Sequence, residues 1–148
     1  MIRKCTEADE LFYRLHLVSK EIDRSFEKLT CTSLTKLEIL FHIHLLGEIT
    51  QTLLIDRIKL DAAAVTRHLK RMEAEELVNR KRESKGKSLM MLTLTKKGQQ
   101  ELIRLERVKE QFQNQLLADL TNEQIIATSQ FIEHISQRIR SKDHANTK

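Results

Sequence analysis

The feature that most restricts the fold of this chain is its shortage of turn-forming residues, since it contains no proline and only three glycines. A β-sandwich or β-barrel needs many tight turns, which draw heavily on glycine and proline. A P-loop or a dinucleotide-binding loop needs clustered glycines, whereas Gly47, Gly86 and Gly98 lie far apart. The sequence therefore predicts a mainly helical protein without the common nucleotide-binding loops.

Length and composition are typical of one folded domain. A chain of 148 residues can bury a core without disulfides or a structural metal. No segment approaches the roughly 20 apolar residues that cross a bilayer, and the residues after Met1 are too charged for a signal peptide. With only two cysteines, we expect a protein of the reducing cytoplasm that does not associate with membranes.

The positive charge is confined to one part of the chain. Ten basic and five acidic residues lie between Arg57 and Lys87, so this segment accounts for the whole net charge of +5. A basic segment in an otherwise neutral protein is typical of a site for a polyanion such as nucleic acid. The alternative is a solvated helix face followed by a charged loop.

Apolar residues at helical spacing predict a first helix over residues 9–29. The sequence Thr35–Glu38 matches a capping box and predicts the start of a second helix. Thr50 and Asp61 are placed to cap two further helices, which are joined at the corner Lys59–Leu60. Two helices joined by so short a turn form a helix-turn-helix.

After Leu77 the apolar residues change from helical to strand spacing. The segments 78–82 and 88–94 predict a β-hairpin with its tip at residues 83–87, and a hairpin in this position is a wing. Thr95 then caps a long helix that has Lys96 and Lys97 in its first turn. Because the helix dipole disfavours cations there, the two lysines either hold an anion or are simply solvated.

Thr121 and Gln124 form a capping box for a last helix, along which isoleucines repeat at heptad spacing. The terminal helices carry more apolar surface than a small winged domain can cover, which favours packing against a second copy. The alternative is that they fold back onto the winged core. We expect a homodimer, with residues 1–33 and 99–148 as a helical dimerisation region around a winged helix-turn-helix domain at residues 34–98.

The sequence resembles the MarR family of bacterial winged-helix transcription regulators. Three segments carry the resemblance: Leu34–Leu40, Asp61–Arg80 and Leu94–Gly98. It implies a winged helix-turn-helix, mainly α with a small β-wing, flanked by long dimerisation helices. It also implies a dimer that binds a palindromic operator, usually represses, and is released by small phenolic or apolar anions or by oxidants.

Two positions depart from the pattern of the family. The wing tip of the family carries an Asp-x-Arg element, whereas Gly86-Lys87-Ser88 stands there in this chain, so we expect little readout of the minor groove. The predicted recognition helix begins Ala62-Ala63-Ala64 instead of with hydroxyl or basic residues. Alanine methyls can contact thymine methyls in the major groove, but alanines are also simply good helix formers.

Basic and small residues around the predicted helix-turn-helix form the candidate DNA site. Arg67 is the candidate for a base contact because arginine can bind guanine O6 and N7 together, and a phosphate contact is its alternative role. The candidates on the recognition helix are Ala62, Ala63, Thr66, Arg67, Lys70 and Arg71. The candidates for backbone contacts on and near the wing are Lys59, Arg80, Arg82, Lys85 and Lys87.

Candidate signal-sensing residues lie outside this region. Cys5 and Cys31 are candidate redox sites, with ordinary surface thiols as the alternative. Glu38 and His42 are zinc-ligand types, but their spacing favours an ion pair or a solvated histidine, so we expect no metal site. The family resemblance places an effector pocket between the first two helices and the winged domain, and its candidate residues, which are equally typical of plain core, are Tyr13, His16 and Phe41.

We therefore predict a sequence-specific DNA-binding transcriptional regulator without a cofactor, and favour a repressor released by a small molecule or an oxidant, although activation stays open. Its expected partners are double-stranded DNA, a second copy of the chain and a small effector. The alternative is a winged-helix module that binds protein, which would not need so basic a wing. We predict no enzyme, because no nucleophile with a base partner and no paired acids stand out.

Overall fold

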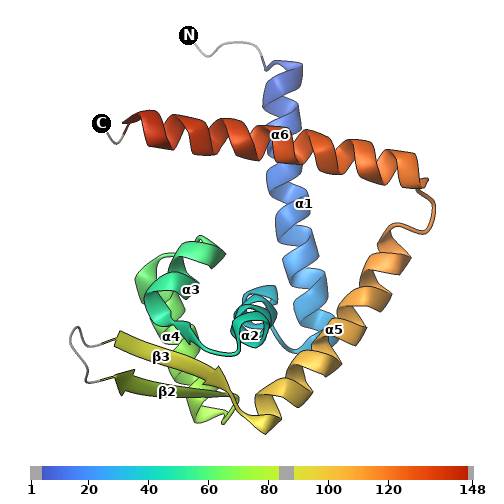
Figure 1. Ribbon diagram of the computed structural model, residues 1–148. Coiled ribbons are helices and arrows are strands. Elements are labelled where there is room, and N and C mark those ends of the chain that lie inside the picture. Colours follow the sequence, from blue (N-terminus) through green and yellow to red (C-terminus); the bar gives the residue numbers. More distant parts are fainter. Residues whose placement is uncertain (1–4, 84–88, 147–148) are drawn as a thin grey trace. The chain divides into compact units, whose positions relative to one another are not determined.

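The computed structural model describes residues 5–83 and 89–146, and the part of the chain that it describes is mainly helical with a three-stranded antiparallel sheet (Figure 1). This confirms the predicted fold class. Residues 84–88, which include Lys85, Gly86, Lys87 and Ser88, lie outside the described residues, whereas Glu83, predicted in the tip of the wing, belongs to a strand. The chain divides into two compact units, Met1–Phe112 and Gln113–Lys148.

The helix-turn-helix forms where the capping residues predict it. In α3 (Gln51–Ile58) the hydroxyl of Thr50 accepts a hydrogen bond from the amide of Leu53 at 3.2 Å. In α4 (Ala62–Ala74) the carboxylate of Asp61 accepts one from the amide of Ala64 at 2.9 Å. These caps satisfy amides that have no partner inside the helix, and they fix where each helix begins.

The predicted start of the second helix is wrong by a small margin. The helix α2 runs from Leu34 to Leu46, and Ser33 precedes it as its cap. The hydroxyl of Ser33 accepts a hydrogen bond from the amide of Lys36 at 3.2 Å. Because this serine already serves the first turn, the capping box expected at Thr35–Glu38 does not form there.

The sheet joins the wing to the helix-turn-helix. Its strands β1 (Ile49–Thr50), β2 (Val78–Glu83) and β3 (Leu89–Leu94) lie in the order β1-β3-β2. The hairpin pairs Val78 with Leu94 and Glu83 with Leu89, while Ile49 pairs with Leu92 across the helix-turn-helix. The strand β1 was not predicted, because two residues are too short to show a strand period.

The core of the first unit lies under the helix-turn-helix and the sheet. It is built from apolar side chains of α2, α3, α4 and β3. The long helices α1 (Glu7–Thr30) and α5 (Lys96–Leu116) each contribute to it. The rings of Phe26 and Phe112 meet edge to face with centroids 6.3 Å apart, which packs the end of α1 against α5. The fully buried residues include Phe26, Ile39, Leu40, Ile43, Leu54, Val65, Leu69 and Leu92.

The turn from α4 into the wing is tied to the start of α5. Thr95 donates its hydroxyl to the carbonyl of Glu76 at 2.6 Å and its amide to the carbonyl of Leu77 at 3.1 Å. A Cβ on Gly98 would lie 2.0 Å from the Leu77 carbonyl oxygen, so only glycine allows this approach. The same hydroxyl accepts a hydrogen bond from the Gly98 amide and caps α5 as predicted.

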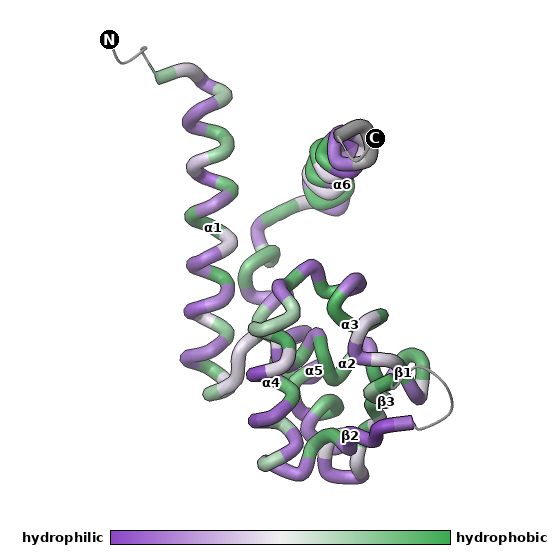
Figure 2. The backbone as a smooth tube through the Cα atoms, turned by 90° about the vertical axis from the view of Figure 1, so that its left-hand side faces the viewer, coloured by the Kyte–Doolittle hydropathy of each residue, from purple (hydrophilic) through white to green (hydrophobic). Residues whose placement is uncertain are grey.

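Both units expose apolar side chains on long helices. In α1 the buried residues are Phe26 and Thr30, close to its C-terminal end, and apolar residues recur along its exposed length (Figure 2). In the second unit α6 (Asn122–Asn146) exposes Ile126, Phe131, Ile132 and Ile139. None of the helices in residues 5–83 and 89–146 has the length and apolar character needed to cross a membrane.

Candidate nucleic-acid interface

The helix α4 separates a buried face from an exposed basic face. Val65, Leu69 and Met72 are buried in the core. On the opposite side the helix exposes Ala63, Arg67, Lys70 and Arg71. Since successive helical residues turn by about 100°, these four positions lie on one side, away from the core. The exposed face therefore combines three cations with the small side chain of Ala63, and the exposed Ala74 follows at the end of the helix.

A shallow pocket opens on this basic face. It has a volume of about 220 Å³ and is lined by Ala64, Arg67, His68 and Arg71. Burial lowers the pKa of His68, and the positive charges of Arg71 and Arg67 lower it further. The surroundings of His68 therefore favour the uncharged form of its imidazole.

Two other residues predicted on this helix lie differently. Ala62 is exposed at its first position. Thr66 is half-buried, and its hydroxyl donates to the carbonyl of Ala62 at 2.7 Å and accepts from the Gln51 side-chain amide at 2.9 Å. The hydroxyl of Thr66 is thus already engaged inside the protein.

The basic residues predicted near the wing fall into two groups. Lys59 and Arg82 are exposed, and Lys59 lies 3.5 Å from the carboxylate of Asp56. Arg80, by contrast, has only 12% of its side chain exposed. Its guanidinium donates to Glu73 at 3.3 Å and to the Gln51 side-chain oxygen at 3.4 Å. Lys85 and Lys87 lie outside the described residues.

The sequence interpretation missed Gln51, which joins Arg80 to Thr66. The available signal was its position directly after the cap Thr50, at the first residue of α3. From there its side chain reaches both α4 and β2. Nothing in the sequence indicates that residues 15 and 29 positions away would be its partners.

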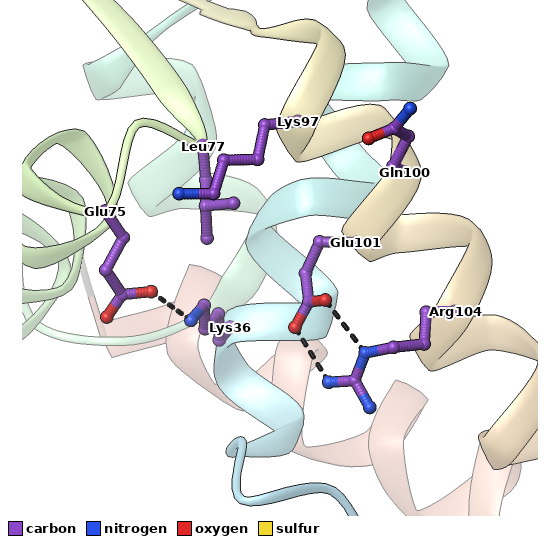
Figure 3. A pocket seen from close by; sticks show the side chains of 7 residues that line it. All are labelled: Lys36, Glu75, Leu77, Lys97, Gln100, Glu101 and Arg104. Atoms are coloured by element: carbon purple, nitrogen blue, oxygen red, sulfur yellow. Dashed lines mark hydrogen bonds and ion pairs between the residues drawn. The ribbon is translucent and has the colours of Figure 1, made fainter.

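A second polar pocket lies where α2, the α4–β2 turn and α5 meet (Figure 3). Its volume is about 450 Å³, and its lining side chains are Lys36, Glu75, Leu77, Lys97, Gln100, Glu101 and Arg104. Lys36 forms an ion pair with Glu75. Arg104 pairs with Glu101 at 2.8 Å, and this hydrogen bond lowers the pKa of Glu101. The described charges of this pocket are largely paired with one another.

The two lysines at the start of α5 have different surroundings. Lys97 lies 3.6 Å from the carboxylate of Glu76, and both side chains are largely exposed. Lys96 is exposed as well. The anion beside Lys97 is therefore a side chain from the α4–β2 turn, which offsets the unfavourable end of the helix dipole.

The predicted sensing residues are on the surface. Tyr13, His16 and Phe41 are exposed, with 62% of Tyr13 accessible, and the pockets described above are lined by other residues. Cys5 and Cys31 are exposed free thiols. The described residues contain no group of three histidine, cysteine or acidic side chains that could hold a metal ion. Burial raises the pKa of Glu38, and the charge of His42 opposes this.

Solved structures share this fold. A mutant of MarR from E. coli in complex with operator DNA has a TM-score of 0.79 at 20% identity, covering 87% of this chain and 95% of that chain. AbsC, a MarR family regulator from Streptomyces coelicolor, has a TM-score of 0.80 at 18% identity, covering 95% and 99%. An organohalide-sensing regulator in its 2,4-dichlorophenol-bound form has a TM-score of 0.81 at 20% identity, covering 93% and 88%.

Sequence comparison places the chain in the same group. Residues 32–86 match the MarR family. The HTH-type transcriptional regulator YdgJ of Bacillus subtilis, itself uncharacterized, is 34% identical over 120 residues, which cover 81% of this chain and 73% of that relative. The resemblance drawn from the three sequence segments is confirmed, and the chain belongs to the MarR family of transcriptional regulators.

Proposed function

We propose that this protein is a homodimer that binds a palindromic DNA operator in a sequence-specific way and represses transcription until a signal releases it. The observation that carries the proposal is the exposed face of α4, with Arg67, Lys70 and Arg71 directed away from the core. An α-helix fits the major groove of B-DNA, and arginine can bind guanine there with two hydrogen bonds. One similar solved protein is in complex with operator DNA.

The exposed basic residues divide into two roles in this proposal. Arg67 lies on the outward side of α4, within the N-terminal half of the helix, and would contact base edges. Lys70, Arg71, Lys59 and Arg82 would contact phosphates, which position the protein without reading sequence. Ala62 and Ala63 allow the helix to approach the base edges closely. Lys85 and Lys87, which are basic residues of the predicted wing, would also contact phosphates.

The dimer is proposed from the apolar surface of the long helices. The described part of α1 exposes Leu11, Phe12, Leu17, Val18 and Ile22, and α6 adds its own apolar residues. Exposed apolar surface of this extent marks an interaction site. A second copy would bury it and would place two α4 helices about one DNA turn apart, near 10 base pairs. Residues 1–33 and 99–148 would then be the dimerisation region.

A small phenolic effector is the proposed signal, since one similar protein was solved with 2,4-dichlorophenol bound. Tyr13, His16 and Phe41 are the proposed contacts. Oxidation of Cys5 or Cys31 is the alternative signal, which their exposure allows. A regulator of this kind works where a bacterial chromosome lies, in the cytoplasm, and the proposal assigns it no catalytic role.

The test begins with a duplex isolated from a random library by the native protein. Fluorescence anisotropy over a salt series compares this duplex with a scrambled one of the same composition. Tight binding to the selected duplex, with a steep fall of affinity with salt and one dimer per site, supports the proposal. Equal and weak binding to both duplexes contradicts it and favours a winged-helix module that binds protein.

A further inference from the structure

We infer that Arg80 is a positioning residue, which holds the recognition helix α4 at a fixed rotation against the wing and α3, and that it does not contact phosphate. The four residues involved, Gln51, Thr66, Glu73 and Arg80, are called the Arg80 network below. The inference rests on the proposed function, since a helix orientation matters to sequence reading only if α4 enters the groove. It gives one of the predicted DNA contacts a different role.

The side chain of Arg80 is largely buried. Arg80 lies on β2, and its side chain is withdrawn behind the exposed surface. The atom Nε is buried and has no hydrogen-bond partner among the described residues. The guanidinium is therefore largely desolvated, and its two terminal nitrogens already donate hydrogen bonds to protein acceptors. A phosphate contact needs a cation that reaches outward, as the exposed Arg82 on the same face of β2 does.

The contacts of Arg80 reach α4 at two places. Arg80 contacts Glu73 directly and Thr66 through Gln51. Thr66 and Glu73 are seven residues apart, so they lie on one side of α4 about two turns, or about 10 Å, from each other. Two attachments on one side, two turns apart, hold both the rotation of the helix about its axis and its tilt against the wing, whereas a single contact leaves the tilt free. That rotation decides where Arg67 points.

The chemistry of the guanidinium also favours a positioning role. A guanidinium offers several N–H donors in a rigid plane and can serve two acceptors at once. Lysine carries the same charge at a single point, so its ammonium cannot bind two acceptors with the same fixed geometry. At a phosphate contact, lysine replaces arginine with little loss. At the centre of the Arg80 network, the same replacement should clearly reduce sequence discrimination.

The experiment compares full-length Arg80→Lys with native protein on the selected and scrambled duplexes, over a salt series. We expect the ratio of the two affinities to fall about tenfold, which corresponds to the loss of one buried hydrogen-bonded contact. We expect the slope of log affinity against log salt to stay unchanged, because the charge is kept. Native-like discrimination by Arg80→Lys would overturn the inference.

A matched control separates the two roles. Arg82→Met and Arg80→Met remove the same charge from the same face of one strand. If Arg82 contacts phosphate, Arg82→Met lowers the salt slope by about one for each protomer and leaves discrimination intact. Arg80→Met should show the opposite pattern. A lowered slope with intact discrimination in Arg80→Met would make Arg80 a phosphate contact and refute the positioning role.

Gln51→Met provides a test that changes no charge and keeps the side-chain length. Its discrimination should fall as far as that of Arg80→Lys, and the double variant should lose no more than either single variant, because the residues act as a unit. Additive losses would overturn the inference. If Arg80→Lys does not fold, by circular dichroism, Gln51→Met carries the comparison alone. Failure of native protein to prefer the selected duplex would instead overturn the proposed function, and the inference with it.

Discussion

Arg67 occupies the centre of the exposed face of α4, with cationic neighbours on both sides. If it contacts a base, Arg67→Ala should weaken binding to the selected duplex by roughly 1–3 kcal/mol and relax the preference at one base position. Lys70→Ala should weaken binding to all sequences alike and lower the salt slope. Anisotropy titrations with single-base variants of the duplex make the comparison. Identical behaviour of the two variants would contradict the assigned roles.

Gly98 is a position where the fold tolerates little change. Because a Cβ there would lie 2.0 Å from the Leu77 carbonyl oxygen, Gly98→Ala should lower the free energy of unfolding by about 3 kcal/mol. Gly47→Ala is the matched control, since its φ of 72° is strained for alanine but nothing lies within 4 Å. We expect about 1–2 kcal/mol there. Urea unfolding of both variants would show a larger loss for Gly47→Ala if the close approach at Gly98 were unimportant.

Single residues also show what the sequence could not predict. Arg80 stands out in the basic segment and Lys97 in the first turn of a predicted helix, but the sequence does not show which side chains lie beside them. Arg80 is withdrawn by Gln51 and Glu73, and Lys97 lies beside Glu76. A count of charges carries no information on burial, so exposed and withdrawn arginines look alike in sequence.

At the scale of elements, helix starts were the most predictable feature of the fold. Thr50, Asp61 and Thr121 each cap a helix as expected, because a cap depends on residues only three positions away. The second helix shows the limit of this reasoning, since Ser33 and Thr35 both offer a hydroxyl and only the structure distinguishes them. The strand β1 escaped prediction because its pairing with β3 is a long-range contact.

We expect the basic pocket on α4 to make DNA binding sensitive to pH. The pKa of His68 is lowered in the free protein, and phosphates near Arg67 and Arg71 would offset the charges that help to lower it. Burial, the larger cause of the low pKa, remains in the complex. Binding should therefore take up a proton below the ordinary histidine value of 6.5, and affinity should rise as pH falls below that value. Titrations between about pH 5 and 8 measure this, and His68→Gln should flatten the rise.

The same histidine has the opposite effect on stability. Because its pKa is lowered on folding, the unfolded chain binds the proton more readily. The stability that neutral His68 contributes is complete above pH 6.5 and is lost as pH falls below that value. His134→Gln on α6 is the control for both measurements. If it flattened the affinity profile as much as His68→Gln, the assignment to the α4 pocket would be wrong.

At the scale of the whole molecule, the proposed dimer depends on apolar residues that the single chain leaves exposed. Ile132 has 49% of its surface accessible on α6. If this helix is part of the interface, Ile132→Glu should weaken the dimer by at least about 2 kcal/mol, because a charge replaces a buried aliphatic side chain. Sedimentation velocity measures the monomer fraction. Gln130→Glu, a polar residue on another side of α6, should leave the dimer intact.

The dimer prediction also links assembly to DNA binding. A monomeric Ile132→Glu variant should bind the selected duplex more weakly at low protein concentration and regain affinity as concentration rises. A variant that stays fully dimeric would show that α6 does not form the interface. The apolar stripe on this helix was visible in the sequence, whereas its partner surface was not, because the stripe alone does not say what covers it.

Different sides of the helix α4 have different roles. One side packs into the core through Val65, Leu69 and Met72. A second side belongs to the Arg80 network through Thr66 and Glu73. The exposed side takes part in neither. Exchanging Ala63, Arg67, Lys70 or Arg71 therefore removes no buried contact. In evolutionary terms, a duplicated gene could acquire a new operator by drift at these four positions while its product stays folded, so specificity can diverge faster than the scaffold that presents it.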